Sequence, residues 1–318
     1  MGILPYNQLM LMCIALAVLF LSEHAAIVPM ANSTSANDRP KHWILCFALL
    51  LCCLPKAPIL LIALSTIVTT LSLMTNSEND CRYASKKFVV HMMLALVMLA
   101  CASSTSFTDT ISAILYILAY GILTVIYPFN GWFDTFCSRA MIWLTSIWLI
   151  VIRSCLAAHF FAKIHTLPNF SIPLIQAFAW LTLAFVPILF FAQTNVKRTA
   201  SRMVCWQTGY LWLFASILPP DKIDIFTMMA ISQGIFLSIV MEVAIYLHKN
   251  KHPLDGLFRT HYFFATFLTT SLVCLIVLLP IFLTKKGVPS ISTNFKLAAL
   301  ATTIIPAIFL KKLYDIVK

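Results

Sequence analysis

Three charged side chains lie within apolar stretches of the sequence and are the first candidates for chemistry. Arg153 lies about midway along one apolar stretch, Glu242 lies in the inner third of another, and Asp109 begins a third. A charge at the centre of a membrane-spanning helix costs roughly 2.5–3.5 kcal/mol on insertion scales, so such residues are usually retained for function. They could relay protons or hold an ion. Alternatively, Arg153 could pair with Glu242 or with a carbonyl, and Asp109 could be the N-cap of the helix that it begins.

The motifs of common enzymes are missing from the sequence. There is no phosphate-binding glycine loop, dinucleotide fingerprint, serine-hydrolase elbow or metal-spaced set of Cys and His. Three histidines, His248, His252 and His261, are close in sequence, but their spacing fits no metal site. We therefore predict no cofactor, no metal and no catalytic residue of the chain's own.

The composition predicts a chain that lipid surrounds. Hydrophobic residues make up 61% of the 318 residues and charged residues only 10%, whereas soluble domains carry about 25% charged residues. So much apolar side chain cannot be hidden inside a water-soluble globule of this size. The net charge of +11 is spread over short loops without a basic, aromatic-rich run, so we predict no nucleic-acid partner.

The elements that must position these charges are membrane-spanning helices. A helix needs about 20 apolar residues to cross the hydrocarbon core, and about eleven stretches approach this length. We predict an all-α integral membrane protein, a single transmembrane domain over residues 1–318. The expected spans are 6–22, 42–55, 57–75, 88–104, 109–127, 139–162, 172–192, 203–219, 224–247, 262–284 and 292–310.

The positive charges between these spans predict the orientation. With eleven spans, 14 Lys and Arg residues fall on the side of the C-terminus and 5 on the other side. Because cytoplasmic loops carry the excess of Lys and Arg, we place the C-terminus in the cytoplasm and the N-terminus outside.

Four short stretches follow one another between about residues 80 and 290. The first is Tyr-Pro-Phe-Asn-Gly-Trp at 127–132, after which Arg153 lies in the next expected helix. The second is Asn-Val-Lys-Arg at 195–198, followed by Gln-Thr-Gly-Tyr at 207–210.

The third stretch is Gln-Gly-Ile-Phe-Leu at 233–237. The fourth is Pro-Leu-Asp-Gly-Leu at 253–257, followed by Ser-Leu at 271–272, Pro280 and Lys285. Taken in order, the four stretches resemble motifs of the antiporter-like membrane subunits of respiratory complex I, membrane hydrogenases and multi-subunit sodium/proton antiporters.

The resemblance has specific departures. Family members read P-F-H-x-W-L-P-D-A at the first stretch, with a lysine in the next helix, where this chain has Asn130 and Arg153. At the third, the family's H-A-x-F-K has lost its histidine and lysine, and Leu237 stands at the lysine position. The family's membrane glutamate has no counterpart before Pro128, where Asp109 is the nearest acid.

The resemblance implies a chain of buried ionisable groups that moves protons or sodium, and other membrane subunits as partners. The residues that it suggests for the ion pathway, with Asp109 added as the nearest acid, are Arg153, Lys197, Glu242, Lys285, Gln233 and Asp109. Those that it suggests for motif structure are Pro128, Trp132, Arg198, Gln207, Gly209, Tyr210, Gly256 and Pro280. It also implies a bacterial inner membrane.

Arginine cannot release a proton within a protein, so Arg153 would block a relay step or replace it with a fixed charge. We expect a diverged subunit of a translocating complex, with no redox site of its own. Two alternatives stay open: an independent secondary transporter of a small solute or ion, and a membrane enzyme or structural protein.

Overall fold

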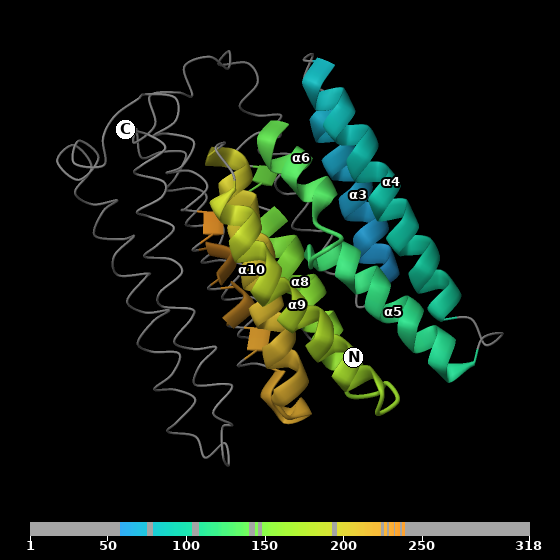
Figure 1. The fold of residues 1–318 in the computed structure, drawn as a ribbon. Helices are drawn as coiled ribbons and strands as arrows, with labels where there is room; N and C mark the ends of the chain where they lie inside the picture. The colour runs from blue at the N-terminus through green and yellow to red at the C-terminus, as the bar shows by residue number, and fades with distance from the viewer. Residues whose placement is uncertain are drawn as a thin grey trace. The chain divides into compact units, whose positions relative to one another are not determined.

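The described part of the chain is helical and contains no strand (Figure 1). In this computed structural model the described residues are 58–74, 79–103, 108–139, 144–145, 148–192, 196–223, 226–227, 229–231, 233–235 and 237–238. Nearly all of them belong to one compact unit, Met1–Gln193 with Lys197–Ser238. Thr194–Val196 and Ile239–Lys318 form a second unit, of which only Val196 is described.

Helices α3 (Pro58–Met74) and α4 (Asn79–Ala102) pack against each other and confirm two of the expected helices. Helix α4 begins nine residues before the expected start at 88. Its first turns carry Arg82 and Lys86, which are exposed. Arg and Lys are good helix formers, so the helix continues beyond its apolar part.

Helix α5 (Asp109–Thr124) agrees with the expected helix, but its N-cap does not. The cap is Thr108, whose Oγ1 accepts from the backbone N–H of Ile111 at 3.5 Å. Asp109 is therefore the first helical residue rather than the cap. At the other end, Val125 adopts a left-handed conformation with φ 71° and ends the helix.

The chain then turns into α6 (Gly131–Arg139), a short helix that the hydropathy pattern did not predict. The turn is held by Trp132, whose Nε1 donates to the carbonyl of Ile122 at 3.0 Å. Trp132 is fully buried and packs edge-on against Phe88 of α4 and Trp148, with ring centroids 5.4 Å and 5.2 Å away. This aromatic cluster joins α4, α6 and the segment that follows.

The expected helix over 139–162 is not uniform. Trp148–Ile152 (η2) is a π-helical turn, and α8 (Arg153–Ile164) continues from it. π-turns are rare and are found mostly as single turns at functional sites. Arg153 is the first α-helical residue after this turn.

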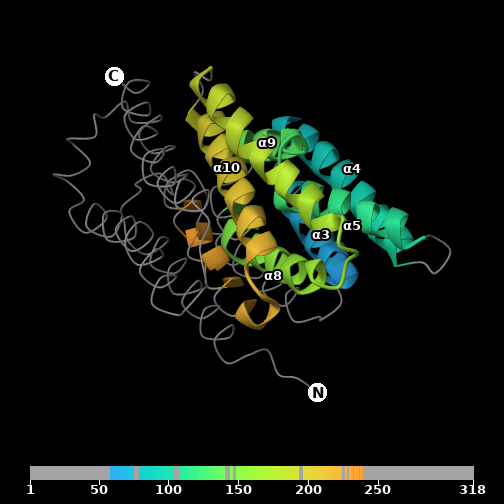
Figure 2. The ribbon, with the colours of Figure 1, turned by 60° about the horizontal axis from the view of Figure 1, so that its bottom comes forward.

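Helices α9 (Ser171–Phe191) and α10 (Val196–Ile217) run side by side (Figure 2). Gly209 makes this possible, because a Cβ there would lie 2.9 Å from the Cβ of Thr182. Helix α9 confirms the expected helix, and α10 begins seven residues earlier than expected. A short 3-10 turn, η3 (Pro220–Lys222), follows.

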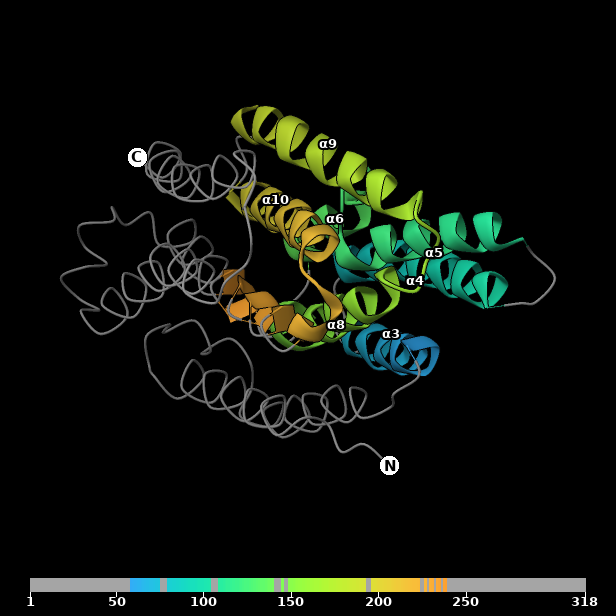
Figure 3. The same cartoon turned by 90° about the horizontal axis from the view of Figure 1, so that it is seen from below.

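Beyond η3 the described positions between 226 and 238 are helical. This segment, orange in Figure 3, lies beside α8, where the rings of Phe226 and Phe161 stack at 4.6 Å. The expected spans 6–22, 42–55, 262–284 and 292–310 lie outside the described residues, as do residues 239–247 of the expected span 224–247.

Large apolar faces of the described helices are open to the surroundings. Val90 and Val97 of α4 are 63% and 55% exposed, and Ile188 of α9 is 65% exposed. Within the described residues, two helical stretches, Arg82–Ala102 and Ser171–Leu189, are long and apolar enough to cross a membrane. The count of eleven spans remains a prediction.

Candidate functional site

Arg153 lies at the centre of the helices and is fully buried, with no exposed side-chain surface. Its Nη2 donates to Oγ1 of Thr208 on α10 at 3.1 Å. The Thr208 hydroxyl lies 2.9 Å from the carbonyl oxygen of Thr124 on α5 and 3.0 Å from that of Val204. The guanidinium thus connects α8 to α10 and, through one hydroxyl, to the end of α5.

A second hydrogen bond ties α5 and α10 together at the same level. Nε1 of Trp212 donates to Oγ1 of Thr124 at 3.0 Å, and that hydroxyl donates to the carbonyl of Tyr120 at 2.6 Å. The ring of Trp212 stacks on Phe160 of α8 at 4.5 Å. Arg153 is therefore held in a position that three helices define.

The Arg153 guanidinium has more N–H groups than it has hydrogen-bond acceptors among the described residues. Its Nε and Nη1 are buried and have no hydrogen-bond partner among them. Arginine carries five N–H donors and stays charged within proteins, and a buried charge without a partner is costly. Arg153 is therefore a costly residue with a location that its hydrogen bond to Thr208 fixes.

Gln233 belongs to the helical segment that packs against the π-turn. A Cβ at the next residue, Gly234, would lie 2.6 Å from the carbonyl oxygen of Leu149 and 2.9 Å from Cα of Ile150. Gln233 is buried, and its Oε1 has no hydrogen-bond partner among the described residues. The structure thus brings the segment of Gln233 to the turn that precedes Arg153.

Two other residues of the predicted ion pathway lie far from Arg153 along their helices. Lys197 is the second residue of α10 and lies eleven residues before Thr208, or about 16 Å along the helix axis. Asp109 is exposed and begins α5 fifteen residues before Thr124, or about 22 Å away along the axis. The described structure therefore does not place either of them beside Arg153.

The remaining predicted residues are distributed as follows. Trp132, Gln207, Gly209 and Tyr210 are buried, Pro128 is exposed, and Arg198 is exposed near the start of α10. Glu242, Lys285, Gly256 and Pro280 lie outside the described residues. The predicted pairing of Arg153 with Glu242 is thus untested.

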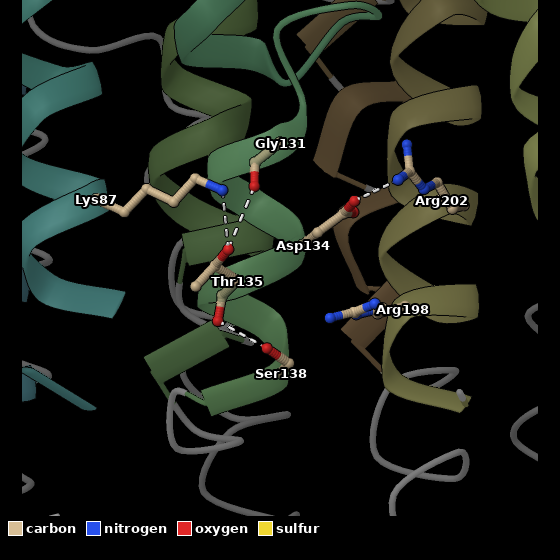
Figure 4. Close-up of a pocket in the computed structure, with 7 residues that line it drawn as sticks. All are labelled: Lys87, Gly131, Asp134, Thr135, Ser138, Arg198 and Arg202. Carbon is tan, nitrogen blue, oxygen red and sulfur yellow. Dashed lines mark hydrogen bonds and ion pairs between the residues drawn. The ribbon is translucent and has the colours of Figure 1, made fainter. Parts of the chain in front are cut away.

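The sequence reasoning missed a second polar cluster, centred on Asp134 of α6 (Figure 4). Its carboxylate pairs with Nη2 of Arg202 on α10 at 2.6 Å and accepts a hydrogen bond from the Ser201 hydroxyl. Lys87 of α4 donates to Oγ1 of Thr135 at 3.2 Å. A signal for this cluster was present, because Arg198 and Arg202 are four residues apart and so share a helix face.

Burial raises the pKa of the Asp134 carboxyl above its ordinary value. This effect outweighs the influence of the surrounding groups that lower the pKa, which are Ser201, Arg202, Arg198 and Lys87. Burial therefore favours the protonated, neutral form of Asp134 more than water would.

No family model matches the chain, and no curated protein matches it.

Proposed function

We propose that the chain is an integral membrane subunit, with about eleven transmembrane helices, of a proton- or cation-translocating complex related to NADH-quinone oxidoreductase. In this proposal Arg153 is a fixed positive charge in the place of a titratable lysine. The observation that supports it best is the complete burial of Arg153 directly after a π-turn.

The chemistry of arginine decides what such a site can do. A buried lysine can release and regain a proton, because burial lowers its pKa, whereas arginine keeps its charge. A permanent cation repels protons and sodium ions over short distances in a medium of low dielectric constant. The relay step at Arg153 would therefore be closed, or the ion would pass by another route.

The packing of the motif residues agrees with this proposal. Trp132 and Tyr210 are buried at helix contacts, and Gly209 allows α9 and α10 to approach closely. Leu237, at the position where the resemblance would expect a second lysine, is buried. A subunit that serves assembly or a modified ion path would retain these contacts without the lysines.

Co-purification tests the proposal directly. The chain would be tagged at its C-terminus, extracted in mild detergent and isolated with whatever remains bound. We expect other membrane subunits of a complex I-like, hydrogenase-like or antiporter assembly. A lone monomer or homodimer would contradict the proposal and would favour an independent secondary transporter.

A further inference from the structure

A pocket of about 270 Å³ opens beside the Asp134 cluster, between α4, α6 and α10 (Figure 4). Helix α4 contributes Lys87, and α10 contributes Arg198 and Arg202. The residues from α6 are Gly131, Asp134, Thr135 and Ser138. With three cations and one carboxylate, the lining has a net charge of +2 when Asp134 is ionised.

The single carboxylate of the pocket is already engaged. Asp134 is bound by Arg202 at 2.6 Å and by Ser201, so it leaves the charges of Lys87 and Arg198 uncompensated within the lining. The Nε of Arg202 is buried and has no partner among the described residues. Lys87 uses one N–H for Thr135, although an ammonium group has three.

These donors suit a phosphate group. Arginine forks, ammonium groups and hydroxyls are the side chains that bind phosphate oxygens, and hydrogen bonds to a charged acceptor are about twice as strong as neutral ones. The hydroxyls of Thr135 and Ser138 line the same space. We propose that this pocket binds the phosphate group of an anionic ligand.

The position of the pocket favours a phospholipid headgroup as the source of that phosphate. Lys87 stands at the edge of the exposed apolar face of α4, nearly in line with Leu94 seven residues later, and Val90 lies between them. An acyl chain could lie along this face while its phosphate reaches Lys87. The pocket also lies on the side that the Lys and Arg count predicts as cytoplasmic, where basic pockets between helices bind anionic headgroups.

The first arm of the test measures lipid retention. The full chain would be purified from membranes that contain phosphatidylcholine with a minor fraction of phosphatidylglycerol, and bound lipids would be counted by native mass spectrometry. The variants are Lys87→Gln and Arg198→Gln. The matched control is Lys86→Gln, which removes the same charge from the adjacent exposed residue that does not line the pocket.

We expect wild type and Lys86→Gln to retain phosphatidylglycerol equally. Each pocket variant should retain about fivefold less, because one basic residue near a membrane surface contributes about 1 kcal/mol. Arg198→Lys keeps the charge and should restore most of the retention, which separates loss of the site from loss of folding. Equal retention in Lys87→Gln, Arg198→Gln and Lys86→Gln would overturn the lipid source.

The second arm uses inorganic phosphate with protein in phosphatidylcholine alone. A rise in thermal stability with phosphate, present in Lys86→Gln and reduced in Lys87→Gln, would assign the pocket to a soluble phosphate ligand. If neither phosphatidylglycerol nor phosphate distinguishes the pocket variants from the control, the phosphate site is wrong. The outcome is independent of the role of Arg153, because co-purifying subunits are not measured.

Discussion

Gly234 lies so close to Leu149 that a Cβ would stand 2.6 Å from the Leu149 carbonyl oxygen. The neighbour is backbone and belongs to the π-turn, so it cannot move aside as a flexible side chain would. Glycine at this position therefore sets the distance between the helical segment of 226–238 and the turn that precedes Arg153.

Gly234→Ala should destabilise the fold by about 1–3 kcal/mol, the usual cost of overpacking a well-packed contact. The matched control is Gly131→Ala, since a Cβ at Gly131 would meet nothing within 4 Å. Thermal unfolding in detergent, followed by the fraction that remains monodisperse, measures both. Equal stability of the two variants would show that the backbone around Gly234 and Leu149 has room for a Cβ.

Thr208→Val should destabilise the protein because it removes the acceptor of the Arg153 guanidinium while keeping the shape of the side chain. Leaving a buried charged donor without that partner costs about 1–3 kcal/mol or more. Thr208→Ser keeps the hydroxyl and should stay much closer to wild type. The same unfolding measurement compares them, and an unchanged Thr208→Val would mean that the 3.1 Å hydrogen bond contributes nothing.

Arg153→Lys is expected to leave ion flux unchanged or to raise it, since a buried lysine can exchange a proton and arginine cannot. Flux would be measured with a pH-sensitive dye in proteoliposomes that contain the assembled complex. Lys163→Arg, at an exposed position on the same helix, is the control. Loss of assembly in Arg153→Lys alone would instead mark Arg153 as a structural partner of another group.

The raised pKa of the Asp134 carboxyl makes the stability of the chain depend on pH. The folded chain holds the Asp134 proton more tightly than the unfolded chain does. The contribution of this group to the free energy of unfolding therefore falls as the pH rises. The fall begins at the ordinary carboxyl pKa and ends above the raised value. Unfolding at a series of pH values, compared between wild type and Asp134→Asn, isolates this contribution.

The orientation predicted from Lys and Arg can be tested at two exposed positions. In a background free of the ten native cysteines, Lys86→Cys should react with an impermeant maleimide in inside-out vesicles. Lys163→Cys should react in right-side-out vesicles, because three expected spans, 88–104, 109–127 and 139–162, separate it from Lys86. Reaction of both from one side would show an error in the number of spans between them.

Hydropathy was sufficient to predict α3, α5 and α9, because each is an almost unbroken apolar run between polar residues. It placed the starts of α4 and α10 too late, since the first turns of those helices carry exposed basic residues that still favour helix. It could not predict α6, which is amphipathic, or the π-turn, whose residues Trp148–Ile152 are as apolar as any α-helical stretch.

The candidate site could be predicted only in part for a related reason. Arg153 is conspicuous in the sequence because it is a charge within an apolar stretch. Thr124 and Thr208 are not conspicuous, and their role depends on three helices meeting at one level. The need for glycine at position 234 likewise cannot be predicted until its neighbour in space, Leu149, is known.

The π-turn at Trp148–Ile152 holds one residue more than an α-helical turn would need. A deletion of one residue within it could therefore be absorbed by conversion to regular α-helix, without shortening the contacts that follow from Arg153 onward. The parts before and after the turn would keep their orientation about the helix axis, whereas a deletion elsewhere in the helix would rotate one part by roughly 100°. Length variation among homologous chains is thus expected to concentrate in this turn.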